Sequence, residues 1–162
     1  MQPEHIKVTL VQRQASIRLR LRWDRSPETC QTLVDMVPIQ EQVFHAKYAN
    51  NEVYVIVESP KILPPPEWRT VYPAPGDLLY IPLPYGLPHP EGVPKADRER
   101  GLLDLAYFYD RASSVQNGPF GPVPGTIVAT AVNLDAVERM ALACNDVWFK
   151  GAFGEAMSIT LD

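Results

Sequence analysis

Apolar and charged residues alternate along the segment from Ser16 to Asp24, and this pattern predicts a strand. The apolar positions are Ile17, Leu19, Leu21 and Trp23, and the positions between them are Arg18, Arg20, Arg22 and Asp24. A period of two places the apolar side chains on one face, so the strand is expected to have one buried and one solvated face. The arginines are interpreted as the solvated face, with a phosphate-binding stripe as the alternative.

A helix is expected directly after this strand. Ser26 is a candidate N-cap, Pro27 suits a first turn that needs no N–H, and Pro38 would end the helix. Its apolar stripe consists of Cys30, Leu33, Val34 and Val37. A second helix is predicted after the candidate cap Asn133, with the apolar stripe Val137, Met140, Ala141 and Cys144.

Other strand-like segments complete the predicted architecture. They are residues 7–11, 41–48, 53–58, 78–81, 104–110, 125–132, 146–149 and 156–161. Asn50 and Asn51 fall in a predicted tight turn between two of these segments, because asparagine tolerates left-handed backbone conformations. About eight strands and two helices predict a mainly β protein, a closed β-barrel with a helix over each end.

The prolines are distributed unevenly along the chain. Of 17 prolines, all but Pro3, Pro27 and Pro38 lie in three clusters. The clusters are Pro60–Pro75, Pro82–Pro94 and Pro119–Pro124. Because proline cannot serve in a central strand, these segments are predicted to be loops. The longest, residues 85–101, either lines a site or interface or is a rigid connection without a ligand.

Length and composition predict an ordinary globular protein. The 162 residues favour a single domain over residues 1–162, and 46% hydrophobic with 21% charged residues argues against disorder. The net charge of −4 and a pI near 5.4 argue against a nucleic-acid partner. No signal peptide and no apolar run of the ~20 residues that span a bilayer can be recognised. Cys30 and Cys144 fit reduced core positions, with a disulfide as the alternative if the two helices pack together, and a cytoplasmic location without a membrane partner is expected.

A few polar residues on predicted strands are candidates for ligand binding. Tyr107, Tyr109 and Arg111 share one face of their strand, and the guanidinium could clamp a carboxylate. The alternative for this arginine is an exposed side chain that pairs with Asp110. His45 suits proton transfer, with a half-buried structural histidine as the alternative.

Several other chemistries have no recognisable motif. His5, His45 and His89 have no partners at metal-ligand spacing, and the two cysteines are far apart in the sequence. There is no glycine-rich phosphate loop and no G-x-S-x-G turn. No metal and no cofactor are therefore expected.

Five segments resemble the cyclophilin-like superfamily. In order they are SIRLRLRWDRSPETCQTLVDMV, VFHAKYANNEVYVIV, APGDLLYIP, DLAYFYDRAS and GTIVATAVNLDAVERMA. The chain is most similar to a group of uncharacterised bacterial proteins with a minimal cyclophilin-like barrel. The resemblance implies the fold more than an activity, since fold and chemistry separate readily.

One departure from that superfamily bears on activity. Its prolyl isomerases carry an arginine directly after a Phe-His pair, where the guanidinium hydrogen-bonds the substrate at the twisting amide. Here the pair is Phe44-His45 and the next residue is Ala46, which has no donor. Lys47 points to the opposite face of a regular strand and cannot replace the arginine. Ordinary prolyl isomerase activity is therefore not expected.

Three functions remain open at this point. The first is binding of a small molecule or short peptide in a cleft lined by His45, Tyr107, Tyr109 and Arg111. The second is an enzyme, either a divergent prolyl isomerase or a small-metabolite enzyme that uses His45 and Arg111. The third is a structural role as a homo-oligomer, in which Leu83, Leu87 and Phe120 of the proline-rich segments are buried between copies.

Overall fold

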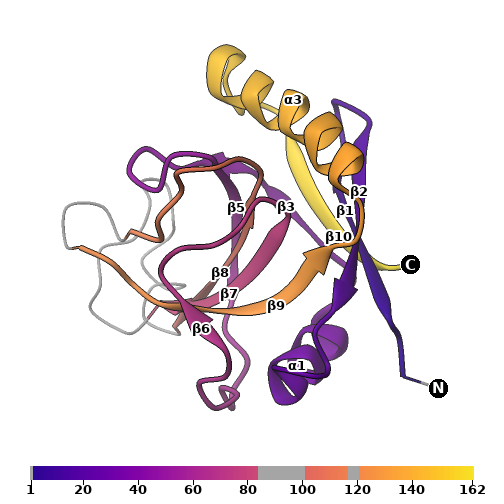
Figure 1. Ribbon diagram of the computed structural model, residues 1–162, viewed down its shortest axis with the longest axis vertical. Coiled ribbons are helices and arrows are strands. Elements are labelled where there is room, and N and C mark those ends of the chain that lie inside the picture. Colours follow the sequence, from indigo (N-terminus) through magenta and orange to yellow (C-terminus); the bar gives the residue numbers. More distant parts are fainter. Residues whose placement is uncertain (1, 84–100, 117–120) are drawn as a thin grey trace.

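One antiparallel sheet of ten strands forms the frame of the computed structural model, which describes residues 2–83, 101–116 and 121–162 (Figure 1). The strands are β1 (His5–Leu10), β2 (Ala15–Leu21), β3 (Ile39–Gln42), β4 (Phe44–His45), β5 (Glu52–Glu58), β6 (Arg69–Thr70), β7 (Asp77–Leu83), β8 (Leu102–Phe108), β9 (Gly125–Ala131) and β10 (Ala156–Leu161). The helices are α1 (Pro27–Met36) and α3 (Leu134–Lys150).

The sheet is open, and the prediction of a closed barrel is wrong. Its strands follow the order β3-β10-β1-β2-β9-β7-β8-β5-β4, with β6 paired to β9 beside this path. No ladder joins the edge strands β3 and β4 in the part of the chain that the structure describes. The reason is a break at Val43: its amide donates to the Glu155 carbonyl beside β10, whereas the next residue, Phe44, pairs with Tyr54 of β5. The predicted strand 41–48 is therefore divided between two edges.

The sheet is covered by apolar side chains on both faces. Alternate residues of β8 point in opposite directions: Leu105 and Tyr107 join the larger core, and Ala106 and Phe108 join the smaller one. The larger core also takes in the buried faces of β1, β2 and both helices. The predicted two-faced strand is confirmed, since Ile17 is buried and the neighbouring arginines of β2 are exposed.

In Figure 1 α3 lies at the top of the view and α1 at the bottom; α3 packs against β2 and β9, and α1 packs against β9. The predicted cap of α3 is confirmed, because the Asn133 side chain accepts a hydrogen bond from the Ala136 amide at 3.1 Å. Ser26 takes the predicted N-cap position of α1, but its side chain does not cap the helix. Ser26 donates its hydroxyl to the Ile127 carbonyl at 2.7 Å, and Glu67 accepts from the Thr29 amide at 2.8 Å instead.

Helix α3 extends further than its first apolar stripe predicted. Residues 146–149, expected to form a strand, are its last turn. Val147 continues the buried row of Val137, Met140 and Cys144, so packing of this helical face overrides the local strand preference of the aromatic residues. Cys30 and Cys144 are buried free thiols, as expected.

The proline-rich segments are only partly loops. Pro82 lies within β7, opposite Leu103 of β8, so its assignment to a loop is wrong. Leu83, proposed as an oligomer contact, is buried in the smaller core of its own chain. Leu87, Phe120 and nearly all of the predicted loop 85–101 lie outside the described residues. Neither α1 nor α3 combines the length and apolar character of a membrane-spanning helix.

Candidate functional site

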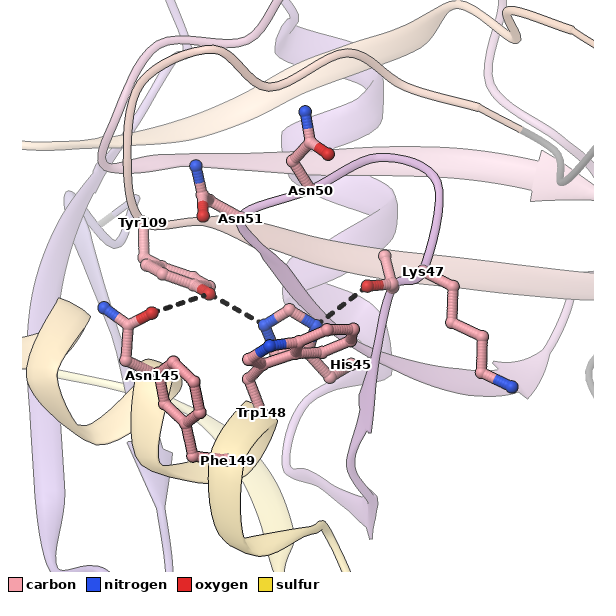
Figure 2. A pocket seen from close by; sticks show the side chains of 9 residues that line it. His45, Lys47, Asn50, Asn51, Tyr109, Asn145, Trp148 and Phe149 are labelled. Atoms are coloured by element: carbon pink, nitrogen blue, oxygen red, sulfur yellow. Dashed lines mark hydrogen bonds between the residues drawn. The ribbon is translucent and has the colours of Figure 1, made fainter.

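A pocket of about 380 Å³ lies between the last turns of α3, the end of β8 and the turn that joins β4 to β5 (Figure 2). Its lining residues are His45, Ala46, Lys47, Asn50, Asn51, Tyr109, Asn145, Trp148 and Phe149. They come from three segments that are far apart in the sequence. The open sheet brings these segments together because β4, β5 and β8 are neighbours.

A chain of hydrogen bonds runs along one side of this pocket. The His45 ring lies with Nε2 at 2.7 Å from the Tyr109 hydroxyl oxygen, and that hydroxyl lies 3.4 Å from Oδ1 of Asn145. The other ring nitrogen, Nδ1, is 2.8 Å from the main-chain oxygen of Ala46. These contacts link strand β4, the residue after β8 and helix α3 through side chains alone.

The partners of His45 determine where its ring carries hydrogen. The Ala46 carbonyl oxygen can only accept, so Nδ1 is the protonated nitrogen. In the neutral ring, Nε2 then accepts the Tyr109 proton. When His45 is protonated, Nε2–H donates to the Tyr109 oxygen instead, and the Tyr109 proton turns to Asn145. Protonation of His45 therefore reverses which group donates and which accepts in the hydrogen bond between His45 and Tyr109.

Burial affects both titrating groups of this chain. It lowers the pKa of His45 below its ordinary value, because the charged ring is poorly solvated there, and the hydrogen bond to Ala46 opposes this only in part. The imidazole is therefore neutral at pH 7. Burial also raises the pKa of the Tyr109 hydroxyl far above its ordinary value, so tyrosine keeps its proton. Both groups of the pair therefore rest in their neutral forms at pH 7.

The turn between β4 and β5 forms the opposite side of the pocket. Asn50 has a left-handed backbone with φ of 66°, which confirms the turn predicted from the two asparagines. The Asn50 Nδ2 group donates to the Ala112 carbonyl at 2.8 Å, and the Asn51 Nδ2 group donates to the Arg111 carbonyl at 2.6 Å. The turn is thus tied to the segment after β8 and holds a fixed shape.

Aromatic side chains from α3 form the third wall. The Trp148 ring lies 4.9 Å from the His45 ring, measured between centroids, and is half exposed. Phe149 is 80% exposed beside it. An exposed aromatic pair next to a hydrogen-bonding chain offers a flat apolar surface to a ligand from solvent.

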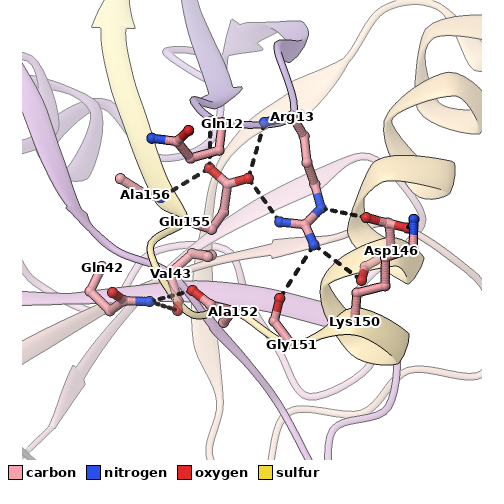
Figure 3. Close-up of polar contacts among 10 residues, drawn as sticks. All are labelled: Gln12, Arg13, Gln42, Val43, Asp146, Lys150, Gly151, Ala152, Glu155 and Ala156. Atoms are coloured by element: carbon pink, nitrogen blue, oxygen red, sulfur yellow. Dashed lines mark hydrogen bonds and ion pairs between the residues drawn. The ribbon is translucent and has the colours of Figure 1, made fainter.

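A network of charged residues holds the end of α3 in place (Figure 3). Glu155 is buried and accepts from the amides of Gln12 and Ala156 at 2.8 and 3.0 Å and from Nη1 of Arg13 at 2.9 Å. Nε of Arg13 also donates to Asp146 on α3 at 3.0 Å. The hairpin between β1 and β2 thereby fixes the last turns of α3, which carry Trp148 and Phe149.

The structure brings together two of the four residues predicted as ligand contacts. His45 and Tyr109 meet in the pocket. Tyr107 is fully buried in the larger core, and Arg111 is exposed and does not line the pocket. A ligand role for Tyr107 and Arg111 stays a prediction that the geometry of this pocket does not support.

Sequence reasoning missed the contribution of α3 to this site. Asn145 lies in the helix directly after the buried Cys144, and Trp148 and Phe149 were assigned to a strand. The signal available in the sequence was the continued helical spacing to Val147, which places Trp148 away from the buried row. Ala46 does line the pocket, and its methyl group offers no donor there.

No group of three or more His, Cys, Asp or Glu side chains suited to a metal occurs among residues 2–83, 101–116 and 121–162.

Fold and site together define a mainly β protein with two helices and a pocket between its sheet and a helix end. The chain belongs to the DUF3830 family, a family of proteins of unknown function whose model matches residues 8–159. No curated protein sequence matches the chain. Membership of the cyclophilin-like superfamily is not confirmed by these comparisons.

A solved structure shares the fold. It is the structure of McbB in complex with tryptophan, which is similar over 97% of this chain with a TM-score of 0.66 and 16% sequence identity. The chain covers only 44% of that protein's length. At this identity the likeness concerns the fold alone.

Proposed function

We propose that this protein binds a small molecule with a planar group in the pocket between α3 and the β4–β5 turn. The observation that carries the proposal is the His45–Tyr109–Asn145 chain beneath the half-exposed Trp148. Polar groups in fixed positions next to an exposed aromatic surface are what small-molecule sites require. The protein McbB, which has a similar fold, was solved in complex with tryptophan, and this is consistent with a small-molecule ligand without indicating which one.

A thermal-shift screen tests this function. The panel contains small aromatic amides, aromatic acids and X-Pro peptides, because a ligand that binds only the folded protein raises its melting temperature. Trp148→Ala removes one wall of the pocket. Phe153→Ala is its matched control, since Phe153 is a fully exposed aromatic residue outside the pocket.

The expected result is a compound that raises the melting temperature of the wild type and of Phe153→Ala but not of Trp148→Ala. A shift that survives both Trp148→Ala and His45→Ala would place binding elsewhere. A panel without any shift would also count against the proposal. A peptide as the only active compound would favour a peptide ligand in the same pocket.

A second candidate is an enzyme that uses the same two residues as an acid–base pair. The 2.7 Å contact between His45 and Tyr109 and the neutral imidazole at pH 7 favour it. Turnover of a compound found in the screen, lost on His45→Ala while binding persists, would distinguish catalysis from binding alone.

A further inference from the structure

The two asparagines of the β4–β5 turn have amide groups whose direction is set by chemistry. Each Nδ2 group faces a main-chain carbonyl, that of Ala112 for Asn50 and that of Arg111 for Asn51. A carbonyl oxygen cannot donate, so the nitrogen and not the oxygen of each amide must make this contact. The oxygen of each amide is the end that remains for a ligand. Figure 2 shows both oxygens nearer to His45 than the nitrogens are.

The hydroxyl of Tyr109 adds a third acceptor to the same pocket. Its single proton goes to Nε2 of the neutral His45 at 2.7 Å, so in this state the 3.4 Å contact with Oδ1 of Asn145 carries no hydrogen bond and the Tyr109 oxygen presents only lone pairs. The His45 ring offers no free donor either, because its Nδ1–H is bonded to Ala46. Asn50, Asn51 and Tyr109 therefore present three neutral oxygen acceptors, and the amide of Asn145, whose Oδ1 faces Tyr109, is a lining side chain that also carries a neutral donor.

Lys47 is the one cationic side chain among the described residues that line the pocket. Lys47 is exposed, and Figure 2 shows its side chain leading away from His45. Arg111, which the sequence suggested as a carboxylate clamp, contributes its main-chain oxygen to the support of Asn51 and does not line the pocket with its guanidinium. A carboxylate ligand would set its oxygens against the oxygens of Asn50 and Asn51, where like partial charges repel.

We propose that this pocket selects ligands by a neutral N–H donor group, such as a carboxamide, attached to a planar ring that packs against Trp148. This inference rests on the proposed small-molecule function and names the chemical class of its ligand. The acceptors on the β4–β5 turn receive the N–H groups, and the aromatic wall of α3 receives the ring. Selectivity follows because unpaired acceptors in a partly desolvated site disfavour a ligand that has no donor.

Isothermal titration calorimetry with two matched compounds tests the selectivity. The probes are 2-naphthylacetamide and 2-naphthylacetate at pH 7.5, which share one ring system and differ only in the head group. The amide is expected to bind at least about tenfold more tightly than the acid, equivalent to about 1.4 kcal/mol. Asn51→Ala should reduce this ratio, whereas the control Gln40→Ala, an exposed amide on β3, should leave it unchanged.

The outcomes separate this inference from the function on which it rests. If the acid binds as tightly as the amide and both are lost on Trp148→Ala, the donor selectivity is overturned while small-molecule binding in the pocket stands. If neither compound binds and the wider screen gives no shift, both proposals fail. The comparison of the two probes on the wild type decides the selectivity even if Asn51→Ala does not fold.

Discussion

The last turns of α3 take part in two polar networks of opposite character. On one side, Asp146 and the buried Glu155 surround Arg13, and the guanidinium donates from Nε, Nη1 and Nη2 (Figure 3). On the other side, Asn145 meets Tyr109 at a long 3.4 Å and His45 lies beneath a half-exposed Trp148 (Figure 2).

The two networks differ in how completely their polar atoms are hydrogen-bonded within the protein. Each oxygen of the Glu155 carboxylate accepts two hydrogen bonds, and this group is almost wholly removed from water. Such a network holds structure, because loss of any member leaves a buried charge unpaired. The chain through His45 has one short and one long contact and leaves acceptors toward the pocket. A network of that kind leaves hydrogen-bonding groups directed toward the pocket, so one helix end joins a rigid support to the surface proposed to bind a ligand.

The largest expected effect comes from breaking the support. Glu155→Ala leaves the Arg13 guanidinium and the amides of Gln12 and Ala156 without their acceptor. The free energy of unfolding, measured with urea, should fall by about 3 kcal/mol. Lys150→Gln is the control, because Lys150 meets the same network from its exposed rim and should change stability only slightly. If the two variants lowered the free energy of unfolding equally, the network around Glu155 would not be the stabilising one described above.

A smaller loss of stability is expected from the pocket. Tyr109→Phe keeps the buried ring and removes the hydroxyl that donates to His45, and water can take the place of that hydroxyl at the half-buried His45 ring. The free energy of unfolding should fall by about 1 kcal/mol or less, while affinity for any ligand found in the screen should fall clearly. Urea unfolding and calorimetry on the same variant give both values. A stability loss as large as that of Glu155→Ala would show that the hydrogen bonds through His45 mainly stabilise the fold, which would contradict the difference between the two networks.

The same comparison explains what the sequence could predict. Alternation and helical spacing are local signals, so β2, both helix starts and the Asn50 turn were predicted from neighbouring residues. His45 and Tyr109 were candidates because their chemistry is recognisable on a predicted strand, and both line the pocket. The open edge at Val43 was not predicted, because it depends on the carbonyl of Glu155 far along the chain.

The third wall of the pocket was missed for a related reason. The aromatic residues at the end of α3 favour a strand locally, whereas Val147 packs into the core as part of a helix. Only the tertiary packing decides between these two, and it decides for the helix. Once the helix is extended, Trp148 and Phe149 fall beside His45, and a strand residue of uncertain role becomes part of a pocket.

The smallest expected effect is a pH dependence of the free energy of unfolding that comes from His45 in the pocket. Burial lowers the pKa of His45 in the folded protein, so the unfolded chain binds a proton more readily at this residue. The stability that His45 contributes is complete above its unfolded pKa of about 6.5 and decreases as the pH falls toward the lower folded value. The wild type should therefore lose stability between pH 7.5 and pH 5 relative to His45→Gln, which lacks the titrating ring.

Urea unfolding of both proteins at the two pH values measures this difference. Burial raises the pKa values of the carboxyl groups of Glu52 and Asp104, which act in the opposite direction, but they are present in both proteins and cancel in the comparison. Asp146 titrates at lower pH, because Lys150 and Arg13 lower the pKa of its carboxyl group. A difference that is independent of pH would show that His45 binds protons equally in the folded and unfolded protein, and the lowering of its pKa by burial would have to be given up.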